Sequence, residues 1–204
     1  MIFETVSVGA MQVNCYILAG QEKGRAIIID PGDQERKIKA ALARHALVPA
    51  LVVNTHGHYD HIGCDDKFGV PVYVHKDDVD FLKDPQLNLS GVFSLGYKVA
   101  SAIMPLEDAQ VLGVDGIELE VMHLPGHTPG GIALLLRKPA QRIVFTGDTL
   151  FAQGIGRCDL VGGDETLLIQ SIRQKLFALA DDTRIYPGHG PASTIGEEKQ
   201  HAIV

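Results

Sequence analysis

Residues 55–61 read Thr-His-Gly-His-Tyr-Asp-His and follow directly on a short apolar run. Imidazole and carboxylate groups are good ligands for zinc and the neighbouring first-row metals. In an extended chain, residues two apart point to the same side, so His56 and His58 can bind one ion together. Asp60 and His61 follow where the chain would turn into a helix, which directs them at a second point nearby. Four such side chains within six residues exceed what one tetrahedral ion takes from a rigid segment, so the stretch predicts two adjacent metal ions.

Three more candidate ligands lie far along the chain, each just after a short apolar stretch. His127 lies in a loop framed by proline and glycine, Asp148 follows a glycine, and His189 lies between two glycines. Such residues hold a loop in a defined turn with little bulk beside the ligand. Sites in α/β folds are commonly built at strand ends, so these residues complete a set of seven expected metal ligands. The other histidines are expected to be ordinary surface or core residues: His45, His75, His123 and His201.

The apolar pattern predicts a layered α/β fold. We expect strands over residues 13–18, 25–29, 51–54, 70–74, 117–122, 132–136, 142–145 and 184–186, and helices over residues 34–46, 77–82 and 165–179. Strands mixed with flanking helices are typical of layered α/β domains. Residues 84–98 carry proline, asparagine, serine and two glycines, and are expected to form a long loop beside the substrate cleft. The length fits one domain over residues 1–204.

Composition narrows the classes of partner. The chain has 204 residues, a net charge of −7 and a pI near 5.7, with no run of lysine and arginine. A phosphate-binding surface normally shows as a basic excess, so nucleic acid is not an expected partner. Three widely spaced cysteines favour a reduced, cytoplasmic protein, and neither a signal peptide nor a membrane span is visible. A small-molecule substrate is the expected partner, and composition does not fix the oligomeric state.

Four short strings carry a resemblance to a known family. They are residues 55–61, Pro-Gly-His-Thr-Pro-Gly over residues 125–130, Thr-Gly-Asp over residues 146–148, and Pro-Gly-His-Gly over residues 187–190. In order and spacing, from Val13 to His189, the chain resembles the metallo-β-lactamase superfamily. Within it, the chain is most similar to the glyoxalase II-like branch, the hydroxyacylglutathione hydrolases. The resemblance implies a four-layer αββα sandwich with metals at one edge.

The resemblance also implies how the ligands divide between two ions. One ion would be held by His56, His58 and His127, and the other by Asp60, His61 and His189. Asp148 would bridge both ions, together with a water or hydroxide. Asp60 and Asp148 are expected to be catalytic as well as metal-binding. Donors of these types suit two divalent ions, with zinc expected and iron or manganese as alternatives.

The implied reaction is metal-dependent hydrolysis of a thioester or a similar small acyl compound. Two ions about 3.5–4 Å apart make hydroxide available at neutral pH, and a metal stabilises the developing oxyanion. A thiolate whose pKa is about 8.5 leaves without a strong general acid. The lack of an obvious extra acid in the sequence is therefore compatible with thioester hydrolysis.

The glutathione site of the branch is retained only in part. Some of that site comes from a C-terminal helical domain, which we do not expect here because only fifteen residues follow His189. Another part is a basic residue followed closely by an aromatic one, whereas here Arg157 is followed by Asp159. Arg157 either meets an anionic substrate or pairs with Asp159.

Two other functions are compatible with the same residues. The string Gly-Arg-Cys-Asp over residues 156–159 also resembles persulfide dioxygenases of the superfamily, in which one iron would be held by His58, His127 and Asp148. The second alternative is a non-catalytic metal-binding module, whose site would lack an open coordination position. The full second ligand set favours the hydrolase. Nuclease and β-lactamase activities stay open because fold does not fix function.

Several neighbours of the ligands are expected either to orient a ligand or to satisfy the backbone at a strand end: Asp30, Thr55, Tyr59 and Thr149. Cys64 and Cys158 are expected to be inert.

Overall fold

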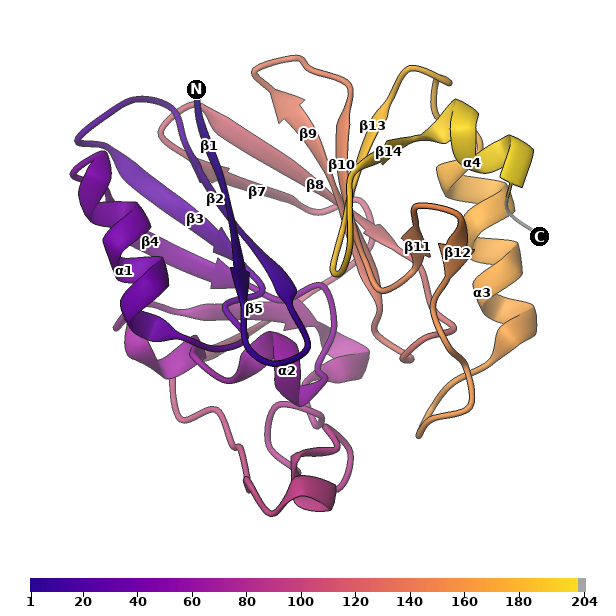
Figure 1. Ribbon diagram of the computed structural model, residues 1–204, viewed down its shortest axis with the longest axis horizontal. Coiled ribbons are helices and arrows are strands. Elements are labelled where there is room, and N and C mark those ends of the chain that lie inside the picture. The colour runs from indigo at the N-terminus through magenta and orange to yellow at the C-terminus, as the bar shows by residue number, and fades with distance from the viewer. Residues whose placement is uncertain (202–204) are drawn as a thin grey trace.

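Two six-stranded sheets face each other in the computed structural model, which describes residues 1–201 (Figure 1). The first sheet consists, in spatial order, of β1 (Ile2–Val8), β2 (Val13–Ala19), β3 (Arg25–Ile29), β4 (Val48–Val53), β5 (Val72–His75) and β6 (Ile103–Leu106). Neighbouring strands are antiparallel from β1 to β3 and parallel from β3 to β6.

The second sheet is mostly antiparallel. In spatial order it consists of β14 (Ser193–Thr194), β13 (Arg184–Pro187), β10 (Ile143–Gly147), β9 (Ile132–Lys138), β8 (Ile117–His123) and β7 (Val111–Val114). Only β10 and β13 are parallel neighbours. A small hairpin of β11 (Leu150–Phe151) and β12 (Gly154–Ile155) follows β10.

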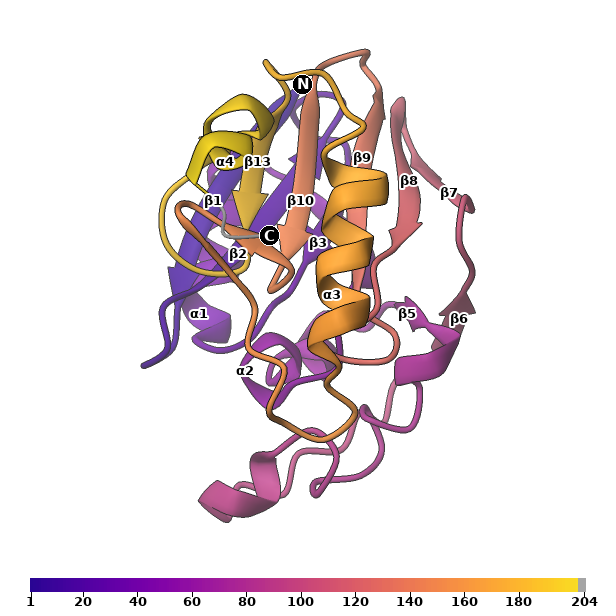
Figure 2. The same cartoon turned by 90° about the vertical axis from the view of Figure 1, so that its right-hand side faces the viewer.

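Helices cover the outer faces of both sheets (Figures 1 and 2). The first sheet is covered by α1 (Glu35–Arg44), and the second by α3 (Glu165–Ser171), its π-helical continuation η4 (Ile172–Leu176) and α4 (Ile195–His201). The connecting loops contain α2 (Tyr59–Ile62) and the 3-10 turns η1 (Asp65–Lys67), η2 (Lys76–Asp78) and η3 (Ser90–Phe93). Within residues 1–201, no helix is both long enough and apolar enough to cross a membrane.

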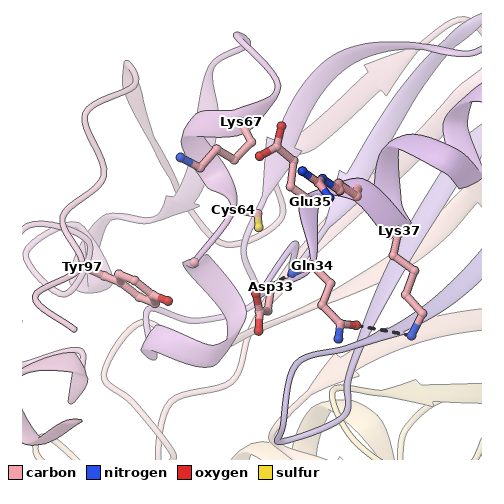
Figure 3. A pocket seen from close by; sticks show the side chains of 9 residues that line it. Asp33, Gln34, Glu35, Lys37, Cys64, Lys67 and Tyr97 are labelled. Atoms are coloured by element: carbon pink, nitrogen blue, oxygen red, sulfur yellow. Dashed lines mark hydrogen bonds between the residues drawn. The ribbon is translucent and has the colours of Figure 1, made fainter. Parts of the chain in front are cut away.

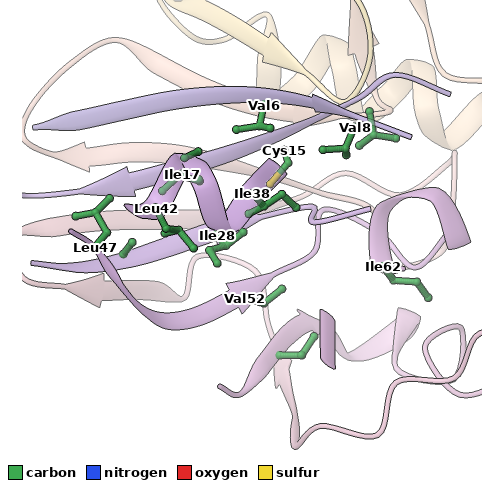
Figure 4. Close-up of a cluster of buried hydrophobic side chains, with 14 of the residues drawn as sticks. Val6, Val8, Cys15, Ile17, Ile28, Ile38, Leu42, Leu47, Val52 and Ile62 are labelled. Carbon is green, nitrogen blue, oxygen red and sulfur yellow. The ribbon is translucent and has the colours of Figure 1, made fainter. Parts of the chain in front are cut away.

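Side chains of β2 alternate between two separate cores. Tyr16 and Leu18 face the second sheet and belong to a cluster that includes Phe145. Cys15 and Ile17 point the opposite way, into the cluster beneath α1 (Figure 4). A strand covered on both faces is expected to be apolar along its whole length, and β2 is buried at every position.

A third core lies between the second sheet and its helices. Leu168, Ile172 and Leu176 pack there with Val144 and Ile185. Three cores separate four layers in the order α, β, β, α. The predicted αββα sandwich is therefore confirmed.

The structure differs from the predicted elements in two ways. The helix predicted over residues 77–82 is wrong, because Asp78 turns its carboxylate inward to accept hydrogen bonds from Gly57 and Gly130, and only the 3-10 turn η2 forms. The helix predicted over residues 165–179 is shorter, since α3 ends at Ser171 and continues as η4. The strands that were not predicted include β1, β6, β7 and β14, which form the four edges of the two sheets.

Candidate metal centre

The seven predicted ligands converge at one end of the sandwich, where loops from both sheets meet. On the first sheet, His56 and His58 follow β4, and α2 carries Asp60 and His61. The second sheet supplies the other three, after β8, β10 and β13 in turn: His127, Asp148 and His189. Three overlapping groups have all their ligand atoms within 4.8 Å of one another: His56, His58 and His127; His56, His61 and Asp148; Asp60, His61 and His189.

The first group is made of neutral imidazoles. His58 Nδ1 lies 2.9 Å from His127 Nε2. His127 Nδ1 donates to the carbonyl of Arg157 at 2.8 Å, which leaves the lone pair of Nε2 facing the cluster. His56 Nδ1 lies 3.2 Å from the hydroxyl of Thr55. Burial lowers the pKa of His58 to about 3 and also lowers the pKa of His56 and of His127, so all three keep a free lone pair at neutral pH.

The second group combines a carboxylate with two imidazoles. His61 Nε2 lies 3.3 Å from His189 Nε2, which in turn lies 3.4 Å from Asp60 Oδ2. The opposite nitrogens are held by the protein: His189 Nδ1 donates to the carbonyl of Met11 at 2.9 Å, and His61 Nδ1 lies 3.1 Å from Asp30 Oδ2. Both imidazoles therefore present Nε2 to the cluster.

Asp148 lies between the two groups. Its Oδ1 is 3.5 Å from His61 Nε2, and its Oδ2 is 3.5 Å from His189 Nε2 and 3.8 Å from His127 Nε2. Burial alone would lower the pKa of His61 and of His189, but Asp148 and Asp60 outweigh it and raise these pKa values to about 9 and about 10. The two carboxylates thus create a place where positive charge is strongly favoured.

The donor set fits divalent metal ions. Within residues 1–201, the buried polar atoms without a hydrogen-bond partner include His56 Nε2 and Asp148 Oδ1. An unpaired buried nitrogen or oxygen costs about 1–3 kcal/mol, so such a concentration needs a cause. Cations placed between the two groups would satisfy these atoms, and they would take the place of the protons on His61 and His189.

Asp30 and Thr55 support the ligands as the sequence suggested. The Asp30 carboxylate accepts hydrogen bonds from Thr55 N and Thr55 Oγ1, both at 2.7 Å, and also lies beside His61. The main chain of Thr149 donates its N–H to the carbonyl of Thr146, and its carbonyl accepts the N–H of Gly156.

Asp78 supports the ligand loops as well, and the sequence did not reveal it. The side chain is fully buried. Its Oδ2 accepts from Gly57 N at 2.9 Å and from Thr128 Oγ1 at 2.8 Å, and its Oδ1 accepts from Gly130 N at 2.6 Å. Gly57 lies between two ligands of the first sheet, and Thr128 follows a ligand of the second. One carboxylate therefore ties together the two loops that carry the first group.

Two glycines permit the close approach of chain segments at the cluster. A Cβ at Gly188 would lie 2.1 Å from Asp148 Oδ1, and one at Gly32 would lie 1.5 Å from the carbonyl oxygen of Asp60. No side chain fits at either position. The glycines of the Asp-Pro-Gly and Pro-Gly-His turns are thus required by packing.

Arg157 lies at the rim of the cluster and pairs with Asp159. Its Nε and Nη2 donate to the two carboxylate oxygens of Asp159 at 2.7 and 2.8 Å, and both side chains are exposed. Of the two roles expected for Arg157, the structure shows the ion pair. The Arg157 carbonyl has a further role that was not expected, since it accepts the hydrogen bond from His127.

His75 and His123 form a separate cluster with Asp77. Their rings stack 3.8 Å apart at 12°, and His123 Nε2 lies 2.9 Å from the carbonyl of Pro129. Lone pairs of imidazole lie in the ring plane, so two parallel stacked rings cannot both direct one at the same ion. Cys64 is a separate case. Its side chain is buried, and burial raises the pKa of its thiol to about 11.

A cleft opens onto the cluster from the solvent. One cavity is lined by His58, Asp60 and His189 together with Leu89 and Phe93. The long loop over residues 84–98 therefore borders the cleft, as the sequence suggested. Tyr59 lines the same cavity and places its ring 5.1 Å from that of Phe93, so it belongs to the cleft wall.

Comparison with known proteins identifies the family. Residues 8–189 match the metallo-beta-lactamase superfamily. The chain belongs to this superfamily, whose members bind divalent metals, and is a metallo-hydrolase of that kind. The predicted membership is confirmed.

The relatives of similar length include two proteins named as hydrolases. The hydroxyacylglutathione hydrolase GloC of Haemophilus influenzae is 37% identical over 208 residues, covering 98% of this chain and 96% of the relative. The probable metallo-hydrolase YqgX of Bacillus subtilis is 35% identical over 205 residues, covering 98% and 95%.

Solved structures show the same architecture. The B3 metallo-beta-lactamase BLEG-1 superposes with a TM-score of 0.90 at 36% identity, covering 99% of this chain and 98% of that one. The di-iron-bound form of TTHA1623 gives a TM-score of 0.84 at 34% identity, with 97% and 98% covered. ETHE1 from Myxococcus xanthus gives 0.79 at 26% identity, with 100% and 84% covered.

Proposed function

We propose that the protein is a dinuclear metal-dependent hydrolase of the glyoxalase II-like type, acting on a thioester or a similar small acyl compound. The observation that carries the proposal is the pair of ligand groups joined by Asp148, whose oxygens lie 3.5 Å from imidazole nitrogens of the second group and 3.8 Å from one of the first. Likeness to GloC and to a di-iron-bound structure supports it. Zinc is the proposed native metal, with iron and manganese as alternatives.

The chain's own residues would hold and orient the metals. His56, His58 and His127 would take one ion, and Asp60, His61 and His189 the other, with Asp148 shared. When bound, the ions would supply Lewis acidity that polarises an acyl carbonyl and lowers the pKa of water.

Backbone carbonyls fix the orientation of two of these ligands. The carbonyls of Arg157 and Met11 hold His127 and His189 in the tautomer that presents Nε2. These side chains would therefore be oriented before the substrate binds, which reduces the reorganisation needed for catalysis. Asp60 and Asp148 contribute the negative charge that keeps two cations close together.

A mononuclear iron persulfide dioxygenase is the second candidate. His58, His127 and Asp148 lie close enough to hold one iron, with 2.9 Å between the first two and 3.8 Å between the last two. The intact group of Asp60, His61 and His189 counts against it, because one iron leaves those three ligands without a role. The open cleft counts against a non-catalytic metal-binding module.

Metal analysis together with a thioester assay separates these candidates. We expect two metal ions per chain, hydrolysis of S-lactoylglutathione, and loss of hydrolysis in the Asp148→Ala variant. One iron per chain, no thioester turnover and oxygen uptake with a persulfide would overturn the proposal in favour of the dioxygenase. Two tightly bound ions with neither activity would favour the non-catalytic module.

A further inference from the structure

The cleft continues past Asp60 into a cavity of about 370 Å³ with a largely apolar wall. We call it the apolar arm and define it by Met11, Tyr59, Phe93, Leu95 and Tyr97. The three aromatic rings form one wall, since the Tyr59 ring lies 5.1 Å from that of Phe93 and 6.4 Å from that of Tyr97. The arm is continuous with the cleft at the cluster, because Met11, Asp60 and Phe93 line both.

The mouth of the arm exposes large apolar side chains. Met11 is 57% exposed, Phe93 58% and Leu95 48%, and the adjoining Val92 is 72% exposed. They come from only two segments, the β1–β2 turn and the loop over residues 84–98. Scattered apolar residues are normal on a protein surface, but a group of them beside a site marks a surface that binds something apolar.

The arm also lacks positive charge. Among the described residues that line it, there is no lysine or arginine, and the charged ones are Asp33 and Asp60. A neighbouring hollow beside α1, drawn in Figure 3, does contain cations: Arg36, Lys37 and Lys67. Asp33 and Tyr97 line both hollows. A carboxylate-bearing group placed in the apolar arm would therefore meet two acidic side chains and no cation.

The cavity on the other side of the cluster contains a guanidinium group. This cavity of about 430 Å³ is lined by Arg157 and Phe151 together with His127 and His189. Among the described residues that line the cavities at the cluster, Arg157 is the only lysine or arginine, and it is already paired with Asp159. The two sides of the cleft thus differ in charge, since one carries Arg157 whereas the charged side chains of the apolar arm are both acidic.

We propose that the substrate is a thioester with an uncharged, medium-length hydrocarbon acyl chain, which lies in the apolar arm while the thiol half lies towards Arg157. This inference rests on the proposed hydrolase function. In the reaction, water adds its oxygen to the acyl carbon, the carbon–sulfur bond breaks, and a proton from water ends on the leaving thiol. The products are a fatty carboxylic acid and a free thiol, and no oxidant or reductant is needed.

Acyl chain length is the variable that tests the inference. With N-acetylcysteamine as a constant thiol, kcat/KM is expected to rise by about fourfold per added methylene from acetyl towards octanoyl, because each buried methylene contributes a roughly constant transfer free energy. Octanoyl thioester should exceed S-lactoylglutathione in kcat/KM. The Phe93→Ala and Leu95→Ala variants should flatten the rise. The matched control is Leu167→Ala, which removes a similarly exposed leucine, 42% exposed, from α3 outside the cleft, and it should leave the rise unchanged.

A binding measurement keeps this inference separate from the proposed function. Calorimetry with octanoate, the carboxylic acid product, should show binding that Phe93→Ala weakens by about tenfold and Leu167→Ala does not. Thioester turnover that is independent of chain length, or that favours S-lactoylglutathione, would overturn the inference and leave the hydrolase standing. If no thioester is cleaved, the proposed function fails. Octanoate binding that depends on Phe93 would then still support the apolar arm as a binding site. If octanoate does not bind, that role of the apolar arm is overturned as well.

Discussion

Asp78→Asn is the substitution that most directly tests how the two ligand loops are held together. Asparagine has nearly the same shape as aspartate but carries no charge. Burial raises the pKa of Asp78 from its ordinary 3.8 to about 6, against the opposing effect of hydrogen bonds from Thr128, Gly130 and Gly57. The folded protein therefore binds a proton at Asp78 more tightly than the unfolded chain does.

This shift fixes the sign and size of a pH effect. Stability that comes from the protonated Asp78 is present below the unfolded pKa and is lost as pH rises through the folded pKa of about 6. A difference of about two pKa units corresponds to roughly 2–3 kcal/mol between pH 4 and pH 7. The variant lacks this group, so its stability relative to the natural protein should improve by that amount over the same interval.

Denaturant unfolding of the metal-free protein at pH 4 and pH 7 measures the effect. Comparing variant with natural protein at each pH cancels the titration of every other group. Asp77→Asn is the matched control for the chemical change, because the neighbouring Asp77 side chain is 46% exposed rather than buried. An equal stability difference at both pH values for Asp78→Asn would refute the reasoning, since it would mean that Asp78 is not buried as a charge.

The same variant has a second readout in metal binding. An amide presents only one oxygen, so at least one of the donors from Gly57, Thr128 and Gly130 loses its acceptor. Because those donors belong to the loops that carry His56, His58 and His127, the first ion should bind about 10–100-fold more weakly. Unchanged affinity for both ions would show that Asp78 supports the fold alone.

Three further changes have defined outcomes. Asp148→Ala removes the carboxylate shared by both ligand groups, so we expect metal analysis to show loss of at least one ion and hydrolysis to fall by about 10²–10³-fold; full metal content would contradict the shared role. Gly188→Ala places a Cβ 2.1 Å from Asp148 Oδ1, and it should destabilise the protein by about 1–3 kcal/mol in thermal unfolding and weaken metal binding; a variant with normal stability would show that the turn can move aside. Because Asp148 and Asp60 raise the pKa of His61 to about 9 and that of His189 to about 10, both imidazoles carry protons near neutral pH when no metal is bound, and metal must displace them. Affinity should therefore rise with pH up to about 10, and calorimetry in buffers of different ionisation enthalpy should detect about two protons released near neutral pH; no release would contradict the protonated state.

The ligands could be found from the sequence because each string is local and chemically unusual. His56, His58, Asp60 and His61 occur within six residues, and a cluster of that kind has few explanations besides metal binding. Asp78 carries no such signal. It follows another aspartate just after a strand, where acidic residues are common, and its inward position is evident only from its hydrogen bonds to both ligand loops in the folded protein.

The strength of the local sequence signal also explains which strands were not predicted. Central strands such as β2 and β3 are covered on both faces and read as apolar runs. The edge strands β1, β6, β7 and β14 are short or partly exposed, and β6 and β7 contain a proline and a glycine, which indicate turns when no partner strand is known. Their place at an edge is a property of the folded sheet, which residue order alone does not contain.

The division of the ligands between the two sheets has a mechanical consequence. Each ligand group contains residues from both sheets of the sandwich, so each proposed ion would act as a removable cross-link between the two sheets. Separating the two sheets would break metal–ligand bonds. The concentration of available metal would therefore determine both the resistance of the protein to unfolding and its activity. Conversely, poorer packing between the two sheets would lower the affinity for metal. A cavity made at Phe145, in the core between the sheets, should then loosen the ions without touching any ligand.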